Sequence, residues 1–248
     1  MCVDFRQPVV NPLPSGYNSD VKARQIHGWH VTTSEARKIQ FELRDRIVRK
    51  CDGATPRYVA GADISFKRNG TATAAAVVLS FPEMEVMESV VIEGRPEFPY
   101  VPGLLTFREA PLVLDAFDRI GTTPDLILVD GQGIAHPRRF GIASHLGLLF
   151  DVPAIGCAKS RLCGQHEEPP LQAPAHTPLN DDGELIGAVL RTKTGSRPLY
   201  ISIGHRIDLP TAVERVLACC RGYRLPEPTR LAHLAAGGGL VPTTVSAR

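Results

Sequence analysis

The order of its extended segments constrains the fold of this chain more than any other feature of the sequence. Three strand-like runs cover residues 58–66, 73–81 and 84–93, and the linkers between them are short. Such linkers leave no room for a crossover helix, so neighbouring runs are expected to pair antiparallel. Asn69-Gly70, in the first linker, is a strong signal for a tight hairpin turn. Residues 125–130 then form a continuous apolar strand bounded by aspartates, a pattern typical of strands that are buried on both faces.

Helical segments are expected before and between the later strands. The first begins at Thr32, because Thr32 and Glu35 have the spacing of a capping box and apolar residues follow at three- and four-residue steps. A second is expected over residues 111–120, since a proline is tolerated in the first turn of a helix. A third, over about 140–150, leads to an apolar strand at 154–158, and this order implies a right-handed parallel crossover.

The C-terminal third is expected to add a loop, a hairpin and two short helices. The expected elements are a polar loop over 161–182, strands over 184–193 and 199–205, a helix with a second capping box at Thr211 and Glu214, and a last helix over 230–236. The whole order of elements is similar to the ribonuclease H-like fold. The expected fold class is therefore α/β, with a mixed sheet of three antiparallel strands followed by parallel strands, flanked by helices.

We expect one folded domain between two irregular ends. Residues 1–30 are rich in Pro, Gly and Asn and are expected to form an irregular arm, whereas residues 31–237 are expected to form a single folded domain and 238–248 a flexible tail. A length of 248 residues with 43% hydrophobic residues supplies one sizeable core and excludes a disordered chain.

Charge and cysteine usage exclude several classes of protein. The net charge of +2 is too balanced to indicate nucleic-acid binding by bulk charge, and the basic run over residues 37–50 is also ordinary for a solvated helix face. The six cysteines have no CxxC motif, which predicts free thiols in a reducing compartment. The paired spacing of a zinc site is missing from the group Cys157, Cys163, His166 and His176. Neither a long apolar run nor a signal-peptide pattern is present, so we expect a cytoplasmic protein without membrane contact.

Three acidic residues stand where acids are costly. Asp63 lies in mid-strand and Asp130 ends the apolar strand, so both are expected near the middle of the sheet, and Glu109 lies near the start of the second helix. Carboxylates held close together repel one another unless a cation neutralises them, and their oxygens suit Mg²⁺ or Mn²⁺. Ions held in this way promote phosphodiester hydrolysis. Each acid also has an ordinary alternative, as a turn residue, an arginine partner or a favourable charge at a helix end.

Three further residues stand in positions suited to nucleic-acid binding. Lys159 follows an apolar strand, where it can hold a phosphate or lie solvated in a loop. Tyr100 is stiffened by Pro99 and Pro102, so its ring can stack on a base or wedge into a duplex, with ordinary core packing as the alternative. His136, which precedes a helix, can bond a base or phosphate or cap that helix.

Five segments, taken in order, resemble one known family. They are 59–66 (VAGADISF), 100–109 (YVPGLLTFRE), 130–138 (DGQGIAHPR), 156–160 (GCAKS) and 202–206 (SIGHR). In these motifs, and in their spacing between about residues 32 and 236, the chain resembles the endonuclease V family of deoxyinosine 3′-endonucleases.

The resemblance implies a Mg²⁺-dependent hydrolase, with Mn²⁺ as a substitute. Such an enzyme nicks DNA at the second phosphodiester bond 3′ to deoxyinosine and leaves a 3′-OH and a 5′-phosphate. The resemblance further implies that Asp63, Glu109 and Asp130 hold the metal. Lys159 and His233 would complete the catalytic residues.

The same resemblance assigns residues to the damaged base. Tyr100, with Pro99 and Pro102 beside it, would open the duplex. The pocket for the extruded hypoxanthine would be lined by Gly103, Gly131, His136 and Leu162. The implied partner is DNA containing deaminated bases, with inosine-containing RNA as a second candidate, and the expected state is a monomer.

Two alternatives stay open at this point. One is a related ribonuclease H-like nuclease that acts on inosine-containing RNA or on branched or flap DNA. The other is a nucleic-acid-binding module that has kept the scaffold without catalysis. The presence of Asp63, Glu109 and Asp130 argues against the second alternative.

Overall fold

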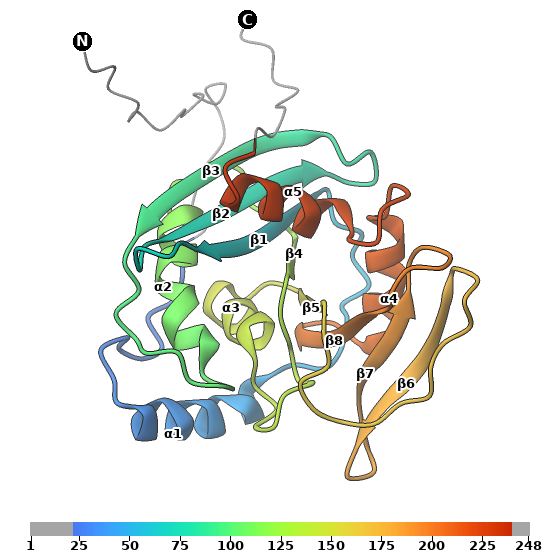
Figure 1. The fold of residues 1–248 in the computed structure, drawn as a ribbon, viewed down its shortest axis with the longest axis horizontal. Coiled ribbons are helices and arrows are strands. Elements are labelled where there is room, and N and C mark those ends of the chain that lie inside the picture. The colour runs from blue at the N-terminus through green and yellow to red at the C-terminus, as the bar shows by residue number, and fades with distance from the viewer. Residues whose placement is uncertain (1–21, 240–248) are drawn as a thin grey trace, which may run out of the picture.

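Eight strands of the chain form one mixed sheet in the order β3-β2-β1-β4-β5-β8-β7-β6 (Figure 1). The computed structural model describes residues 22–239, so residues 1–21 of the expected arm and 240–248 of the expected tail lie outside the described residues. The strands are β1 (Tyr58–Phe66), β2 (Ala72–Ser80), β3 (Val86–Gly94), β4 (Leu126–Val129), β5 (Ala154–Ala158), β6 (Ala175–Asp181), β7 (Glu184–Arg191) and β8 (Leu199–His205).

The pairing of the strands confirms the expected mixed sheet. β1, β2 and β3 pair antiparallel in sequence order, and Gly70 turns the first hairpin with a φ of +84°. β4 and β5 join as parallel strands beside β1, which is the arrangement that the strand–helix–strand order predicts. β8, β7 and β6 then extend the sheet with antiparallel pairs.

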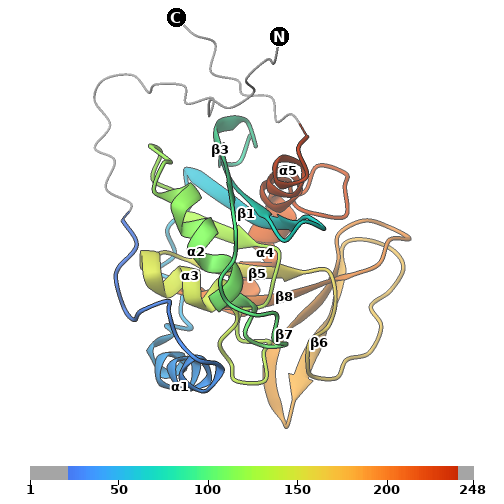
Figure 2. The ribbon, with the colours of Figure 1, turned by 60° about the vertical axis from the view of Figure 1, so that its left-hand side comes forward.

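Helices cover both faces of this sheet (Figure 2). Alternation along β1 divides its side chains, because Val59 belongs to the apolar cluster under α4 and α5, whereas Ala60 and Ala62 belong to the cluster under α2 and α3. The helices are α1 (Thr33–Leu43), α2 (Leu105–Phe117), α3 (Ile142–Phe150), α4 (Leu209–Ala218) and α5 (Glu227–Ala236), and Arg44–Arg46 form a short 3₁₀ turn after α1. The capping box at Thr32 and Glu35 is confirmed, with both reciprocal hydrogen bonds present.

The expected start of α2 is wrong by six residues. The helix begins at Leu105 and carries Pro111 in its interior, instead of beginning near that proline. An internal proline removes one backbone hydrogen bond. Phe107, which is upstream of Pro111 and 1% exposed, shows that the buried face of α2 begins before the proline, and this burial offsets the missing bond. Glu109 consequently lies within the helix and not at its start.

The segment expected as a loop over 161–182 contains strand β6. This strand lies at the edge of the sheet, where it pairs with β7 and forms one isolated bridge, from Asn180 to Gln165. Only Leu179 among its side chains is buried, so it carries no apolar pattern that would predict a strand. Pro178 fits an edge position, because one side of an edge strand needs no backbone donor.

The two C-terminal helices both begin earlier than expected. The N-cap of α4 is Asp208, whose carboxylate accepts from the backbone N–H of Thr211 at 2.9 Å, so the predicted capping box of Thr211 with Glu214 is wrong. Pro210, in the first turn of α4, has no N–H that needs a partner. The carboxylate of Asp208 bonds the next free N–H, that of Thr211. The last helix, α5, starts at Glu227, three residues before the expected position.

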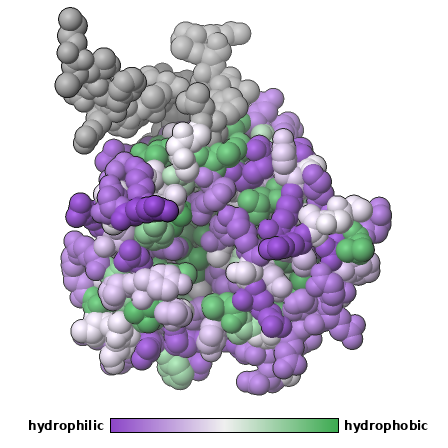
Figure 3. All heavy atoms as spheres, in the orientation of Figure 1, coloured by the Kyte–Doolittle hydropathy of each residue, from purple (hydrophilic) through white to green (hydrophobic). Residues whose placement is uncertain are grey.

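One face of the surface is largely hydrophilic, and the cysteines of residues 22–239 form no disulfide. The face seen in Figure 3 is mostly hydrophilic, with apolar groups scattered among charged ones. In residues 22–239 no helix has the length and apolarity needed to cross a membrane. The five cysteines in the described part of the chain are free thiols, as expected.

Candidate active site

Two of the predicted acids lie side by side because their strands are parallel neighbours. β1 and β4 pair up to Ala62 and Val129, and Asp63 and Asp130 come one residue further on each strand. The two carboxylates therefore lie side by side in the middle of the sheet, where β4 ends. His233, on α5, joins them, so that one ligand atom from each of these three residues lies within 4.8 Å of the others. His233 Nδ1 lies 2.6 Å from Asp63 Oδ2.

Helix α5 reaches this position because β1 has no side chain in its way. A Cβ atom on Gly61 would lie 1.9 Å from the carbonyl oxygen of Pro228, in the first turn of α5. Gly61 and Asp63 point to the same face of the sheet, two residues apart. The glycine thus permits the close approach that carries His233 to the carboxylate.

Glu109 lies close enough to Asp63 and Asp130 for their charges to act on it. Burial, and then the charges of Asp63 and Asp130, raise the pKa of Glu109 to about 8. Burial and the neighbouring Asp130 also raise the pKa of Asp63, although the hydrogen bond from His233 opposes this shift. Negative charges that raise the pKa of neighbouring carboxyl groups in this way mark a place that a cation would stabilise.

The donors present in this cluster fit a hard divalent cation. Two carboxylates, of Asp63 and Asp130, converge with the imidazole of His233, and carboxylate oxygens are the ligands that Mg²⁺ and Mn²⁺ prefer. Asp63 and Asp130 are mostly buried, with side chains 11% and 14% exposed, so both are fixed by packing. The geometry confirms that Asp63 and Asp130 meet at one place. The place of Glu109 in the metal site, and the role of all three acids as metal ligands, stay predictions.

Lys159 projects into the cluster from the end of β5. Its ammonium is paired with Asp130 Oδ2, and it lies 3.4 Å from His233 Nδ1. The alternative of a freely solvated loop lysine is wrong, because the side chain is held by its partners and is 34% exposed. A positive charge at this point is available to a phosphate that approaches the carboxylates.

A second group of predicted residues meets at the carbonyl of Gly103. The backbone N–H of Arg138 donates to His136 Nδ1 at 3.1 Å, which leaves the proton of the neutral ring on Nε2. His136 Nε2 then donates to the oxygen of Gly103 at 3.0 Å. Burial, reinforced by the charge of Arg138, lowers the pKa of His136 to about 4, so the imidazole is neutral. His136 therefore shapes the backbone at Gly103.

The remaining predicted site residues lie at the surface or next to Asp130. Tyr100 is 69% exposed, so the alternative of a buried packing tyrosine is wrong. Pro99 and Pro102 beside it are exposed as well. Leu162 is also exposed, at 45%, and is not part of the buried core. Gly131 directly follows Asp130, and a Cβ atom there would lie 2.4 Å from the side chain of Ile142.

Two residues of this region were missed by the sequence analysis. Arg138 Nη2 and Gln40 Nε2 both donate to the oxygen of Gly103, at 2.6 and 3.0 Å, and Arg138 Nε also donates to Gln40 Oε1. Gln40 is buried on the apolar face of α1 between Ala36 and Leu43. A glutamine on a buried stripe was the available signal, because a buried amide needs specific partners.

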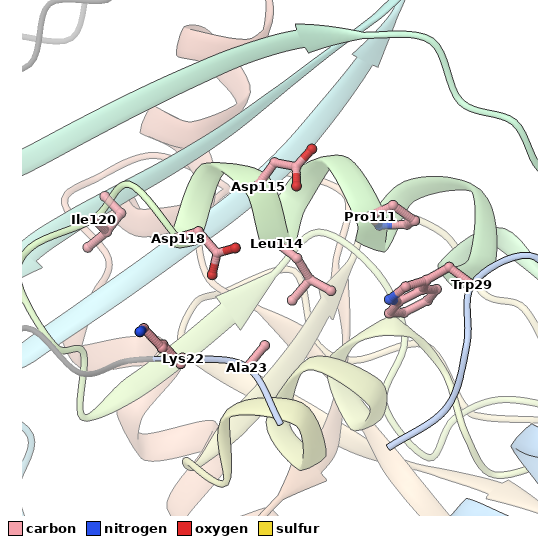
Figure 4. A pocket seen from close by; sticks show the side chains of 8 residues that line it. All are labelled: Lys22, Ala23, Trp29, Pro111, Leu114, Asp115, Asp118 and Ile120. Atoms are coloured by element: carbon pink, nitrogen blue, oxygen red, sulfur yellow. The ribbon is translucent and has the colours of Figure 1, made fainter. Parts of the chain in front are cut away.

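Two surface hollows lie along α2 on the side of the 22–31 segment. One, of about 560 Å³, has Trp29 at one end and Lys22 at the other, and Asp115 on α2 and Asp118 just after that helix also line it (Figure 4). None of the predicted site residues lines it. A second hollow of about 640 Å³ includes Pro99 in its wall and so borders the Tyr100 loop.

Comparison with known proteins decides the family. The family model described as Endonuclease V matches residues 41–234, a segment that contains every residue of the acidic cluster. The chain belongs to the endonuclease V family. The resemblance of the five sequence motifs to that family is thereby confirmed.

Relatives within the endonuclease V family cover nearly the whole domain. The chain is 55% identical over 214 residues to the endonuclease V of Nostoc punctiforme, covering 86% of this chain and 97% of the relative. The solved endonuclease V of Streptomyces avermitilis superposes with a TM-score of 0.80 at 41% identity, covering 88% of this chain and 96% of that structure.

A third member of the endonuclease V family has been solved with a nucleic acid. The Ciona intestinalis protein, at a TM-score of 0.75 and 27% identity, covers 84% of this chain and 98% of that structure. That protein is in complex with a 23mer DNA that contains an inosine followed by a ribo-adenosine.

Proposed function

We propose that this chain is a metal-dependent endodeoxyribonuclease that hydrolyses the second phosphodiester bond 3′ to deoxyinosine and leaves a 3′-OH and a 5′-phosphate. The observation that carries the proposal is the meeting of Asp63, Asp130 and His233 in an endonuclease V family chain, with Glu109 near enough for the two aspartates to raise its pKa. The inosine-containing DNA bound by the Ciona relative supports the substrate. We further propose that residues 31–237 form the catalytic domain and act as a monomer in the cytoplasm.

Asp63, Glu109 and Asp130 are the residues that would hold the divalent ion, with His233 beside Asp63. A bound Mg²⁺ would supply Lewis acidity, which activates water as a nucleophile and stabilises the charge that develops on the leaving oxygen. Lys159, already among the carboxylates, offers its ammonium to the scissile phosphate. The hydrogen bond between His233 and Asp63 fixes the orientation of that carboxylate.

Recognition of the damaged base is proposed for the loops on either side of the acids. A base stacked in a duplex can enter a protein pocket only if it is extruded, and a mispaired base is cheaper to extrude. The exposed ring of Tyr100 is suited to take the place of the extruded base in the stack. Gly103, Gly131, His136 and Leu162 are proposed to line the pocket, with the neutral His136 holding the backbone of Gly103 in place.

The test is a cleavage assay that maps the nick. A labelled duplex with one deoxyinosine is incubated with the protein in Mg²⁺ or in EDTA, beside a duplex with deoxyadenosine at the same position. We expect one nick, at the second phosphodiester 3′ to the inosine, in Mg²⁺ only. Cleavage at another bond, or equal cleavage of the deoxyadenosine duplex, would contradict the proposal.

A second candidate substrate is inosine-containing RNA. The DNA bound by the Ciona relative has a ribonucleotide directly after its inosine, which favours including RNA in the comparison. Single-stranded RNA with one inosine and a flap DNA without inosine are therefore run in the same assay. Faster cleavage of the RNA than of the deoxyinosine duplex would assign the chain to RNA, and cleavage of the flap alone would assign it to branched DNA.

A further inference from the structure

The backbone around Lys159 lies where regular sheet pairing stops. The last pair between β5 and β8 is Ala158 with Tyr200. Beyond it the partner segment contains Pro198, which has no N–H and cannot continue the ladder. The carbonyls of Lys159 and Pro198 therefore need donors from outside the sheet, and a lysine at a free strand end would be poorly fixed without them.

Arg224 supplies those donors. Its Nη2 donates to the carbonyl oxygens of Lys159 and Pro198, each at 2.9 Å, and its Nε donates to the oxygen of Arg197, also at 2.9 Å. The carbonyl of Arg224 itself accepts from the hydroxyl of Thr192 at 2.5 Å, which anchors the segment that carries the guanidinium. Among residues 22–239 Arg224 forms no ion pair with a carboxylate, so its donors serve backbone carbonyls.

Gln132 holds the same strand end from the other side. Gln132 follows β4, the strand that pairs with β5, and its side chain is buried, with 8% exposed. Its Nε2 donates to the carbonyl oxygen of Ser160 at 2.9 Å. The carbonyls of two consecutive residues beyond β5, Lys159 and Ser160, thus accept hydrogen bonds from Arg224, in the segment between α4 and α5, and from Gln132, after β4.

We propose that Arg224 and Gln132 are positioning residues that clamp the end of β5 and thereby aim the Lys159 ammonium at the acidic cluster. This inference rests on the proposed function, in which Lys159 serves the scissile phosphate. A fixed backbone limits the directions in which a long, flexible side chain extends, and misplacement of a catalytic group is costly. The clamp explains how a lysine just beyond a strand reaches Asp130 and His233.

The geometry distinguishes a clamp from a simple phosphate contact. A guanidinium is planar and carries several donors in a fixed fork, whereas an ammonium is a compact point charge on a flexible stem. Arg224→Lys therefore keeps a charge for DNA but cannot reproduce the fixed fork in which Nε and Nη2 bond carbonyls of two segments. Arg224→Gln removes the charge as well. Gln132→Met removes the second grip at similar volume.

The matched control is Arg221→Gln. Arg221 lies three residues before Arg224, is exposed, and also donates to backbone carbonyls, those of Pro82, Ala218 and Cys220. None of these carbonyls adjoins the acidic cluster, so this variant loses an arginine of the same kind without loosening Lys159. Thermal unfolding of every variant establishes that it is folded.

The first readout separates binding from turnover. Single-turnover nicking of the one-deoxyinosine duplex is expected to slow by roughly tenfold or more in Arg224→Gln and Arg224→Lys alike. The dissociation constant for that duplex is expected to stay within about twofold, because a positioning residue does not hold the DNA. Gln132→Met shifts the rate in the same direction, and Arg221→Gln leaves it unchanged.

The second readout needs no substrate. The chain has only six lysines, at positions 22, 38, 50, 67, 159 and 193, so lysine-selective ¹³C/¹⁵N labelling gives a simple NMR spectrum of the side-chain ammonium groups. Comparison with Lys159→Arg assigns the signal of Lys159. In wild type that signal is expected apart from those of solvated lysines, and in both Arg224 variants it is expected to move to their position.

The outcomes are separable. A folded Arg224→Gln protein with an unmoved Lys159 signal overturns the clamp. Restored nicking in Arg224→Lys also overturns it, because a phosphate contact then explains the arginine. If wild type nicks no inosine substrate, the proposed function fails, whereas the Lys159 signal in the variants still decides whether Arg224 and Gln132 position this lysine.

Discussion

At the scale of single residues, the acidic cluster is a balance between repulsion and neutralisation. Glu109 has an ordinary pKa of 4.5, and burial with two nearby aspartates raises this pKa to about 8. Between these values the folded protein binds a proton at Glu109 that the unfolded chain releases. The stability that this proton confers is therefore fully present below pH 4.5 and is lost as the pH rises toward 8.

Protein held in EDTA is accordingly expected to become less stable between pH 5 and pH 8. One such group contributes a slope of at most about 1.4 kcal/mol per pH unit. Glu109→Gln should flatten the slope, although Asp63, whose pKa is also raised, keeps part of it. Urea unfolding at several pH values measures the effect, with the exposed Glu83→Gln as control. An identical slope in wild type and Glu109→Gln would show that Glu109 ionises freely.

Tyr100 has a role at the same scale that does not depend on the metal. Its ring is 69% exposed, so Tyr100→Ala should leave the melting temperature unchanged. The variant is expected to bind the deoxyinosine duplex more weakly by roughly 1–3 kcal/mol, the worth of one stacking contact, with an unchanged Mg²⁺ requirement. Fluorescence anisotropy on inosine and undamaged duplexes measures the preference, and Phe41→Ala removes another exposed ring for comparison. A preference for inosine equal to wild type would remove Tyr100 from recognition.

At the scale of elements, sequence reasoning succeeded where structure is decided locally. The hairpin at Asn69-Gly70 and the capping box at Thr32 depend on residues a few positions apart, and both are present. The start of α2 was mispredicted because contacts with the sheet outweigh the local effect of Pro111. Strand β6 was missed because an edge strand needs a partner and no apolar stripe.

The same division of local and distant causes applies to the candidate site. The meeting of Asp63 and Asp130 followed from parallel strands, which the element order predicts. The position of His233 was available only through the family resemblance, because it depends on how α5 docks on β1. The bonds from Gln40 and Arg138 to the carbonyl of Gly103 join segments far apart in sequence, so a local pattern can mark Gln40 as a buried amide but cannot name its partner.

Docking of α5 on β1 is therefore the element contact to test. Gly61→Ala places a Cβ atom where the backbone of Pro228 lies, so the helix must move away. We expect a loss of about 1–3 kcal/mol in the free energy of unfolding, together with slower nicking as His233 retreats from Asp63. Gly28→Ala, where nothing lies within 4 Å, is the control. Unchanged stability and activity in Gly61→Ala would mean that α5 is not seated against this strand.

At the scale of the whole molecule, the sheet serves as a rigid frame that gathers distant residues. Residues from β1, from α5 and from the ends of β4 and β5 meet near the middle of the sheet, and α2 brings Glu109 close to them. A buried apolar cluster lies on either face of the sheet. A frame of this kind can hold repelling carboxylates together because packing supplies the necessary free energy. With a net charge of only +2, the chain must bind DNA through local groups, and its affinity should fall with salt.

The most direct test compares wild type with Asp130→Asn on the one-deoxyinosine duplex while Mg²⁺ is titrated. The substitution keeps the shape of the side chain and removes one negative charge from the cluster. We predict nicking that saturates with Mg²⁺ in wild type, and nicking lost by two orders of magnitude or more in Asp130→Asn, roughly the scale at which a lost catalytic contact is felt, with duplex binding retained. Nicking by Asp130→Asn at the wild-type rate in Mg²⁺ would contradict a cation site built on these carboxylates.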